Sequence, residues 1–127
     1  MAVLASTDEL TGTFNRRVFV QESNQTMQHF SHTRVPFTIG ILDIDHFKHF
    51  NDTFGHEAGD LVLQEIAHFI QTNIRSSDTA CRYGGEEMTL IFPDTTLEIA
   101  SDRAQFLCEG IRGLKRQHHN RDLGQIT

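Results

Sequence analysis

The chain has 127 residues, which suits a single domain. With 38% hydrophobic and 22% charged residues it has the composition of an ordinary globular domain, which excludes collagen-like and disordered classes. Its formal net charge of −6 argues against a broad nucleic-acid interface. The two cysteines, Cys81 and Cys108, lack the spacing of a disulfide framework or a zinc site. Because no apolar stretch has the length of a membrane span, we expect a cytoplasmic domain without membrane contact.

The first predicted element is a helix that Asn15 caps and that ends before Pro36. Its predicted apolar face contains Phe19, Met27 and Phe30. The run at residues 35–44 follows, rich in β-branched and aromatic residues and apolar on both faces. This pattern predicts a central strand that brings Asp43 to its C-terminal end.

Two helices are predicted next. Asp45 can cap a short helix whose core face is formed by Phe47, Phe50 and Phe54. A longer helix is expected from about residue 58 to residue 74, because apolar residues recur there at helical spacing. The apolar band of this second helix consists of Val62, Leu63, Ile66, Ala67, Phe69 and Ile70.

Strands at residues 79–83 and 87–92 flank Gly84-Gly85, which predicts a tight hairpin with an acidic tip. Thr95 and Glu98 then form a capping box for a helix. Apolar residues of that helix recur at Leu97, Ala100, Ala104, Leu107, Ile111 and Leu114. Residues 115–122 are expected to be a polar loop, and a further strand begins at residues 123–127. This order predicts an α+β fold, a ferredoxin-like antiparallel sheet flanked by helices.

Acidic residues gather at two predicted strand ends. Asp43 and Asp45 follow the first strand, and Glu86 and Glu87 lie on the hairpin. If the hairpin pairs beside the first strand, three or four carboxylates converge, and a hard divalent cation such as Mg²⁺ relieves their repulsion. For any single one of these residues, a solvated acidic turn or a helix cap is the more common explanation.

A second group of polar residues lies in the glycine-spaced turn between the two central helices. Asn51 and Asp60 carry an amide and a carboxylate, which can bind the donor edge of guanine. Helix capping explains the same residues without any ligand. In the same way, Arg75 and Asp78 suit either a phosphate and guanine site or a surface ion pair.

Histidines at positions 46, 49 and 56 also raise a zinc hypothesis. It is disfavoured because no fourth ligand is evident and the phenylalanines occupy the buried face of that helix.

Several motifs in order resemble the GGDEF domain of diguanylate cyclases. They are DELTGTFNRR (residues 8–17), DIDHFKHFNDTFGHEAGD (43–60), RSSD (75–78) and RYGGEEM (82–88). The resemblance implies a palm-type nucleotidyl-cyclase sheet and condensation of two GTP into cyclic di-GMP and pyrophosphate with Mg²⁺ or Mn²⁺. In that reaction the 3′-hydroxyl of one GTP attacks the α-phosphorus of the other. A homodimer is needed, because each subunit presents one GTP.

The resemblance also implies a role for each matched position. Asp43 and Glu86, the catalytic pair, would hold the metals together with the carbonyl of Ile44, and Glu87 would add an acidic contact. Asn51 and Asp60 would bind guanine. Lys48 and the backbone at His46 and Phe47 would contact phosphates. Arg75 and Asp78 match the RxxD inhibitory site, at which the product binds.

The resemblance assigns residues 1–7 to a lead-in from a linker helix, preceded by a sensory domain in the parent protein, and residues 8–127 to the GGDEF domain. The family continues beyond residue 127 through a further strand, a helix and phosphate-binding cations. We therefore expect the last strand region to be missing and this segment to be weak or inactive as an enzyme. Met88 replaces the final aromatic residue of the signature, a tolerable change at a packed site. The alternatives are a cyclic di-GMP receptor and a cyclase with an adenine-containing product, which Asp60 disfavours.

Overall fold

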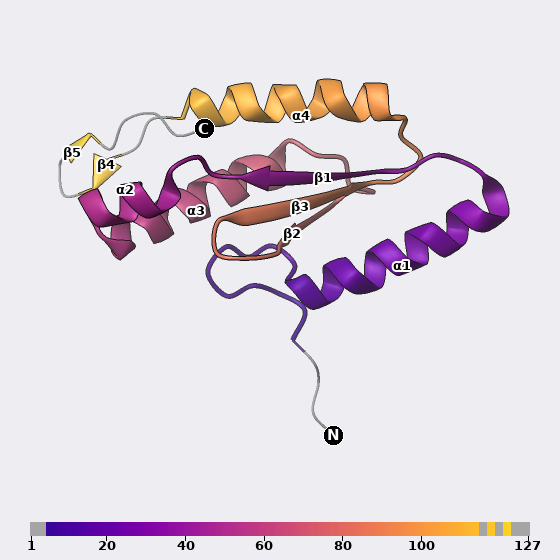
Figure 1. Cartoon of the computed structure of the whole chain (residues 1–127), viewed down its shortest axis with the longest axis horizontal. Coiled ribbons are helices and arrows are strands. Elements are labelled where there is room, and N and C mark those ends of the chain that lie inside the picture. The colour runs from indigo at the N-terminus through magenta and orange to yellow at the C-terminus, as the bar shows by residue number, and fades with distance from the viewer. Residues whose placement is uncertain (1–4, 115–116, 119–120, 123–127) are drawn as a thin grey trace.

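The structure is a computed structural model that describes residues 5–114, 117–118 and 121–122. Four helices and a three-stranded antiparallel sheet make up most of this part of the chain (Figure 1). In chain order the elements are α1 (Arg16–Thr33), β1 (Thr38–Asp43), α2 (Phe47–Phe54), α3 (His56–Thr72), β2 (Thr79–Arg82), β3 (Glu87–Phe92), α4 (Leu97–Arg112), β4 (Gln117–His118) and β5 (Arg121–Asp122). The predicted α+β class is confirmed.

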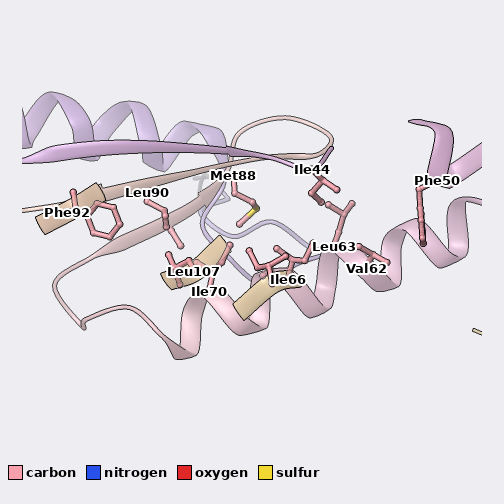
Figure 2. Close-up of a cluster of buried hydrophobic side chains, with 14 of the residues drawn as sticks. Ile44, Phe50, Val62, Leu63, Ile66, Ile70, Met88, Leu90, Phe92 and Leu107 are labelled. Carbon is pink, nitrogen blue, oxygen red and sulfur yellow. The ribbon is translucent and has the colours of Figure 1, made fainter. Parts of the chain in front are cut away.

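The sheet has helices on both of its faces. Its strand order is β1-β3-β2, and both pairings are antiparallel. In Figure 1, α4 and α1 lie on opposite sides of the strands. Alternate residues of β3 therefore point to different layers. Met88, Leu90 and Phe92 join the cluster formed with α3 and α4 (Figure 2).

The core is centred on α3, whose predicted apolar band is confirmed. Val62, Leu63, Ile66 and Ile70 are buried between the sheet and α4, and Phe50 extends the cluster to α2 (Figure 2). Helices α3 and α4 approach closely where Gly110 meets Phe69. A Cβ atom at Gly110 would clash with the ring of Phe69, so only glycine allows this approach.

The prediction that residues 35–44 form a central strand is wrong for the described residues. β3 lies in the middle of the sheet and β1 lies at its edge. Burial alternates along β1, and Ile41 is 72% exposed on the face away from the core cluster. The apolar residues on both faces suggested a buried strand, although α4 and α3 cover only one face of it.

Several local predictions also differ from the structure. Met27 is exposed, and Val18 is the buried residue of α1. The side chain of Thr96, not that of Thr95, caps α4 by accepting a hydrogen bond from the backbone N–H of Ile99. Leu97 is 75% exposed because it occupies the first turn, beyond the edge of the core.

The C-terminal part of the chain contains a short β pairing. Residues 117–118 pair antiparallel with residues 121–122, so these four do not belong to the predicted polar loop. The strand expected at residues 123–127 lies outside the described residues. Among the described helices, none is both long and apolar enough to cross a lipid bilayer.

Candidate active site

The antiparallel register of β1 and β3 brings two carboxylates opposite each other. Asp43, the last residue of β1, is the cross-strand partner of Glu87, the first residue of β3. Just beyond this pair, the backbone N–H of Ile44 donates a 3.4 Å hydrogen bond to the carbonyl of Glu86. Side chains of directly opposed residues lie close together on one face of a sheet, so like charges there repel each other. The hairpin therefore does pair beside the strand that carries Asp43.

The loop that carries Glu86 is one residue longer than the predicted hairpin, because β2 ends at Arg82 and not at Tyr83. Residues 83–86 join the strands, and neither Gly84 nor Gly85 has a φ angle in the left-handed region. The backbone N–H groups of Tyr83 and Gly84 both donate to the carbonyl of Glu87, at 2.9 and 3.3 Å. A Cβ atom at Gly84 would lie 3.3 Å from Oε1 of Glu87, so this carboxylate lies beside the loop.

Arg82 fixes this loop to the N-terminal turn. Its Nε donates to the carbonyls of Gly84 and Gly85, and its Nη2 donates to Gly85 at 3.0 Å. Its Nη1 lies 3.3 Å from the carboxylate of Asp8. Burial raises the pKa of Asp8, but hydrogen bonds from Thr11 and the charge of Arg82 outweigh this effect and leave the pKa below its ordinary value.

The acidic residues suit a magnesium ion but do not form a complete cage. No set of three or more acidic, histidine or cysteine side chains lies close enough to hold a metal in the part of the chain that the structure describes. The expectation that three or four carboxylates converge is therefore not met by the side chains as placed. Mg²⁺ commonly uses only one or two protein carboxylates together with water and substrate phosphates. The register of β1 and β3 brings two carboxylate residues, Asp43 and Glu87, to one edge of the sheet, with Glu86 adjacent.

The turn between α2 and α3 presents a buried amide oxygen. Oδ1 of Asn51 is buried, and it has no hydrogen-bond partner among the described residues. It lies against Gly59, where a Cβ atom would clash with it. Asp60 follows Gly59 and is exposed. An unpaired buried acceptor costs free energy unless a ligand or water satisfies it, so Asn51 fits a ligand-binding role.

The residues expected near phosphates surround the start of α2. Asp45 does not cap this helix, because the N-cap residue is His46, with φ of 57° and no side-chain cap bond. Lys48 is exposed and Phe47 packs against the core. The side chain of the N-cap residue His46 therefore leaves the backbone N–H groups of the first turn of α2 uncapped by itself, and N–H groups at the start of a helix attract anions.

Arg75 and Asp78 form a closed polar network and not a surface ion pair. The side chain of Asp78 has no exposed area; its Oδ1 accepts from Arg75 at 2.9 Å, and its Oδ2 lies 3.0 Å from Nη2 of Arg103. Nη2 of Arg75 also donates to the carbonyl of Pro93 and to the hydroxyl of Thr95. The hydrogen bond to Asp78 raises the pKa of Arg75 above its ordinary value. The guanidinium of Arg75 remains partly exposed, with a side-chain exposure of 44%.

Sequence reasoning missed the side chains that hold these groups. Arg103 and Thr95 come from α4 and the turn before it, and they bind the Arg75–Asp78 pair from a distant part of the sequence. Arg82 is the first residue of the RYGGEEM motif, and the motif by itself indicates no role for it. A pattern in one sequence does not reveal such partners, because their contacts arise from packing of separate elements.

Comparison with known proteins identifies the family. The family described as diguanylate cyclase, GGDEF domain, matches residues 5–127, and the chain belongs to it. It is 46% identical over 125 residues to the response regulator PleD of Caulobacter vibrioides, covering 98% of this chain and 28% of PleD. It is 38% identical over 122 residues to the diguanylate cyclase VdcA of Vibrio cholerae, covering 94% of this chain and 35% of VdcA. The chain thus spans about a third of these relatives.

Solved structures agree with this assignment. The GGDEF domain of DgcB from Caulobacter crescentus, crystallised in complex with c-di-GMP, superposes with a TM-score of 0.92 at 36% identity. The match covers all of this chain and 73% of the DgcB chain. The arrangement of four helices and an antiparallel three-stranded sheet is therefore that of GGDEF domains.

Proposed function

We propose that this domain condenses two molecules of GTP into cyclic di-GMP and pyrophosphate. The observation that carries the proposal is the register of β1 and β3, which sets Asp43 opposite Glu87 with Glu86 on the adjoining loop. Membership of the GGDEF family supports the same reaction. Glu86 and Asp43 are the residues that we assign to catalysis.

The acidic edge formed by Asp43, Glu86 and Glu87 is the proposed site of Mg²⁺ or Mn²⁺. Asp43 and Glu86 would be the principal ligands, with the carbonyl of Ile44 and the carboxylate of Glu87 as further contacts. When bound, the metal would neutralise phosphate charge and make the 3′-hydroxyl of GTP easier to deprotonate. Hard oxygen donors are the ligands that these ions prefer.

The turn between α2 and α3 is the proposed guanine site. The buried Oδ1 of Asn51, which lacks a partner among the described residues, is a suitable acceptor for the N2 amino group of guanine. Asp60 would accept from the N1 and N2 donors, which adenine lacks. Lys48 and the backbone at His46 and Phe47 would contact the phosphates. In this orientation the triphosphate would lie between α2 and the acidic edge.

Turnover would need two copies of the domain, because one guanine site and one acidic edge serve one GTP. We propose a homodimer in which the two bound nucleotides face each other. In the parent protein an upstream sensory domain would set this arrangement; the chain covers only about a third of PleD and VdcA, which are longer proteins.

Turnover of GTP tests the proposed function directly. The chain is incubated with GTP and Mg²⁺, and the product is identified by mass, beside parallel reactions with ATP. Cyclic di-GMP from GTP alone supports the proposal. If ATP binds as well as GTP in competition calorimetry, the guanine assignment is wrong, and if neither nucleotide binds, the cyclase proposal fails.

A second proposed activity is product binding at Arg75 and Asp78. The partly exposed guanidinium of Arg75 is available to a phosphate or a guanine edge, while buried Asp78 holds it in place. Such binding would restrain the enzyme, or make the domain a cyclic di-GMP receptor if it does not turn over GTP. Calorimetry with cyclic di-GMP should show binding that Arg75→Ala abolishes, and unchanged binding in this variant refutes the assignment.

A further inference from the structure

We infer that Arg16, the first residue of α1, is a positioning residue for the loop that carries Glu86; this inference rests on the proposed function. The guanidinium carbon of Arg16 lies 4.3 Å from the centroid of the Tyr83 ring. Its Nη2 also donates a 3.1 Å hydrogen bond to the Tyr83 hydroxyl. Phe19 forms a T-shaped contact with the same ring, with centroids 5.6 Å apart and the planes at 83°.

Tyr83 is well placed to transmit this contact to the acidic edge. It directly precedes Gly84-Gly85-Glu86, and its backbone N–H donates to the carbonyl of Glu87 at 2.9 Å. A Cβ atom at Gly85 would meet nothing within 4 Å, so no side chain packs on that side of the loop tip, which is held through its carbonyl by Arg82. The path of the loop therefore depends on its two anchors, which are Tyr83 on the α1 side and Arg82 with Asp8 on the other.

The position of Arg16 in its helix supports a specific role. Positive side chains in the first turn of a helix are disfavoured by the helix dipole, and the first turn of α1 has no acidic residue. Asn15 caps this turn, and its side-chain amide and backbone N–H also donate to the carbonyls of Ala5 and Ser6. The start of α1 is thus fixed on the N-terminal segment, and Arg16 extends from this fixed point to the loop.

The inference predicts a change in metal use. With Arg16→Met, the loop samples arrangements in which Glu86 is out of place, and Mg²⁺ must select the competent one. We expect about a tenfold lower kcat, equal to about 1.4 kcal/mol, with KM for GTP changed less than about twofold. The Mg²⁺ concentration for half-maximal activity should rise several-fold, a change that a loss of stability alone does not produce.

The chain offers a matched control at the other end of the same helix. The guanidinium of Arg34 lies 5.6 Å from the ring centroid of Phe30, so Arg34→Met removes a similar contact far from the loop. Arg34→Met should leave kcat and the Mg²⁺ requirement unchanged. If Arg16→Met lowers Tm more than Arg34→Met does, the milder variants Arg16→Lys and Tyr83→Phe are tested in place of Arg16→Met. We expect smaller losses of kcat from these two variants.

Tyrosine fluorescence provides a test without turnover. Tyr83 is the only tyrosine and the chain has no tryptophan, so emission near 300 nm reports on this residue. Mg²⁺ is titrated in the presence of 3′-deoxy-GTP, which lacks the attacking hydroxyl. We expect an emission change whose midpoint moves to higher Mg²⁺ in Arg16→Met but not in Arg34→Met.

The outcomes separate this inference from the proposed function. If the unmodified chain converts GTP into a product other than cyclic di-GMP but the emission midpoint shifts as expected, the cyclase proposal fails and the positioning role stands. If Arg16→Met matches Arg34→Met in kcat, Mg²⁺ requirement and emission midpoint, the positioning role is refuted. An emission that does not respond to Mg²⁺ in the unmodified chain also refutes it, because Tyr83 must then be independent of the acidic edge.

Discussion

The two ends of β2 hold charged groups in opposite ways. Before its first residue, Asp78 is fully buried and both of its carboxylate oxygens are bound by arginines. Beyond its last residue, the loop leads to the acidic edge, where backbone pairing sets Asp43 opposite Glu87. At one end side chains satisfy each other; at the other, the backbone holds carboxylates that remain available to a ligand. The first arrangement favours stability and the second favours chemistry. Three sets of substitutions and one pH dependence test this difference.

The largest effect is expected at the acidic edge. Glu86→Gln should reduce cyclic di-GMP formation by about 10³-fold, because an uncharged amide is a poor ligand for Mg²⁺. The free energy of unfolding should be almost unchanged. Glu98→Gln, in the exposed first turn of α4, is the matched control for activity and for urea unfolding. A large loss in the free energy of unfolding for Glu86→Gln would contradict the proposal that the acidic edge serves chemistry and not stability.

The next effect concerns stability at the other end of β2. Asp78→Ala should lower the free energy of unfolding by about 3 kcal/mol, because it leaves Arg75 and Arg103 without their shared buried partner. Arg75→Ala should cost less, since the Arg75 side chain is 44% exposed and Asp78 keeps Arg103. Urea denaturation of both variants measures the difference. Equal losses in the free energy of unfolding for the two variants would show that Arg75 and Asp78 form an ordinary surface ion pair.

A smaller effect on binding is expected at the turn between α2 and α3. In Gly59→Ala, the new methyl group displaces the amide of Asn51, so GTP affinity should fall about tenfold, equal to about 1.4 kcal/mol. Asn51→Ala should give a similar loss. Because both changes act on one contact, the double variant should bind GTP no more weakly than either single variant. Additive losses, measured by calorimetry, would show that Gly59→Ala acts on another contact, and unchanged affinity in Asn51→Ala would place Asn51 outside the guanine site.

The smallest effect is a pH dependence within β2 itself. Burial raises the pKa of the Cys81 thiol to about 11, from an ordinary value of 9.0. The unfolded chain therefore releases this proton first, so the stabilisation is complete below pH 9 and is lost as the pH rises toward 11. Relative to Cys81→Ala, the unmodified chain should lose about 1 kcal/mol more stability between pH 8 and about pH 9.7. Equal losses of stability with rising pH in the unmodified chain and in Cys81→Ala would contradict this role of the Cys81 thiol.

The sequence predicts the helices and strands of the fold better than it predicts which of these elements lie next to one another. The residues of α3 show a regular apolar period, and its buried face was predicted correctly. β1 was misplaced as a central strand because an apolar run does not reveal which strands lie beside it. The caps of α2 and α4 were misassigned by one residue, since adjacent polar residues compete for the same position.

The candidate site was predictable where it depends on local order. A strand ending at Asp43 and a hairpin bearing Glu86 follow from short patterns, and their meeting follows from antiparallel pairing. The supporting contacts were not predictable in this way. Arg82 and Asp8 are separated by 74 residues, and Arg16 and Tyr83 by 67, so no local period relates them. Only packing of α1 and the N-terminal turn on the sheet brings them together.

The register of β1 against β3 determines both the packing of Leu42 in the core and the position of Asp43 opposite Glu87. Leu42 packs against the core cluster opposite Met88, and the next pair along is Asp43 with Glu87. A slip of one residue would turn Leu42 outward and Asp43 inward, so the same shift would damage the interior and separate the carboxylates. Any screen that selects variants of β1 for stability alone will consequently preserve the geometry of the acidic pair, even without selection for catalysis.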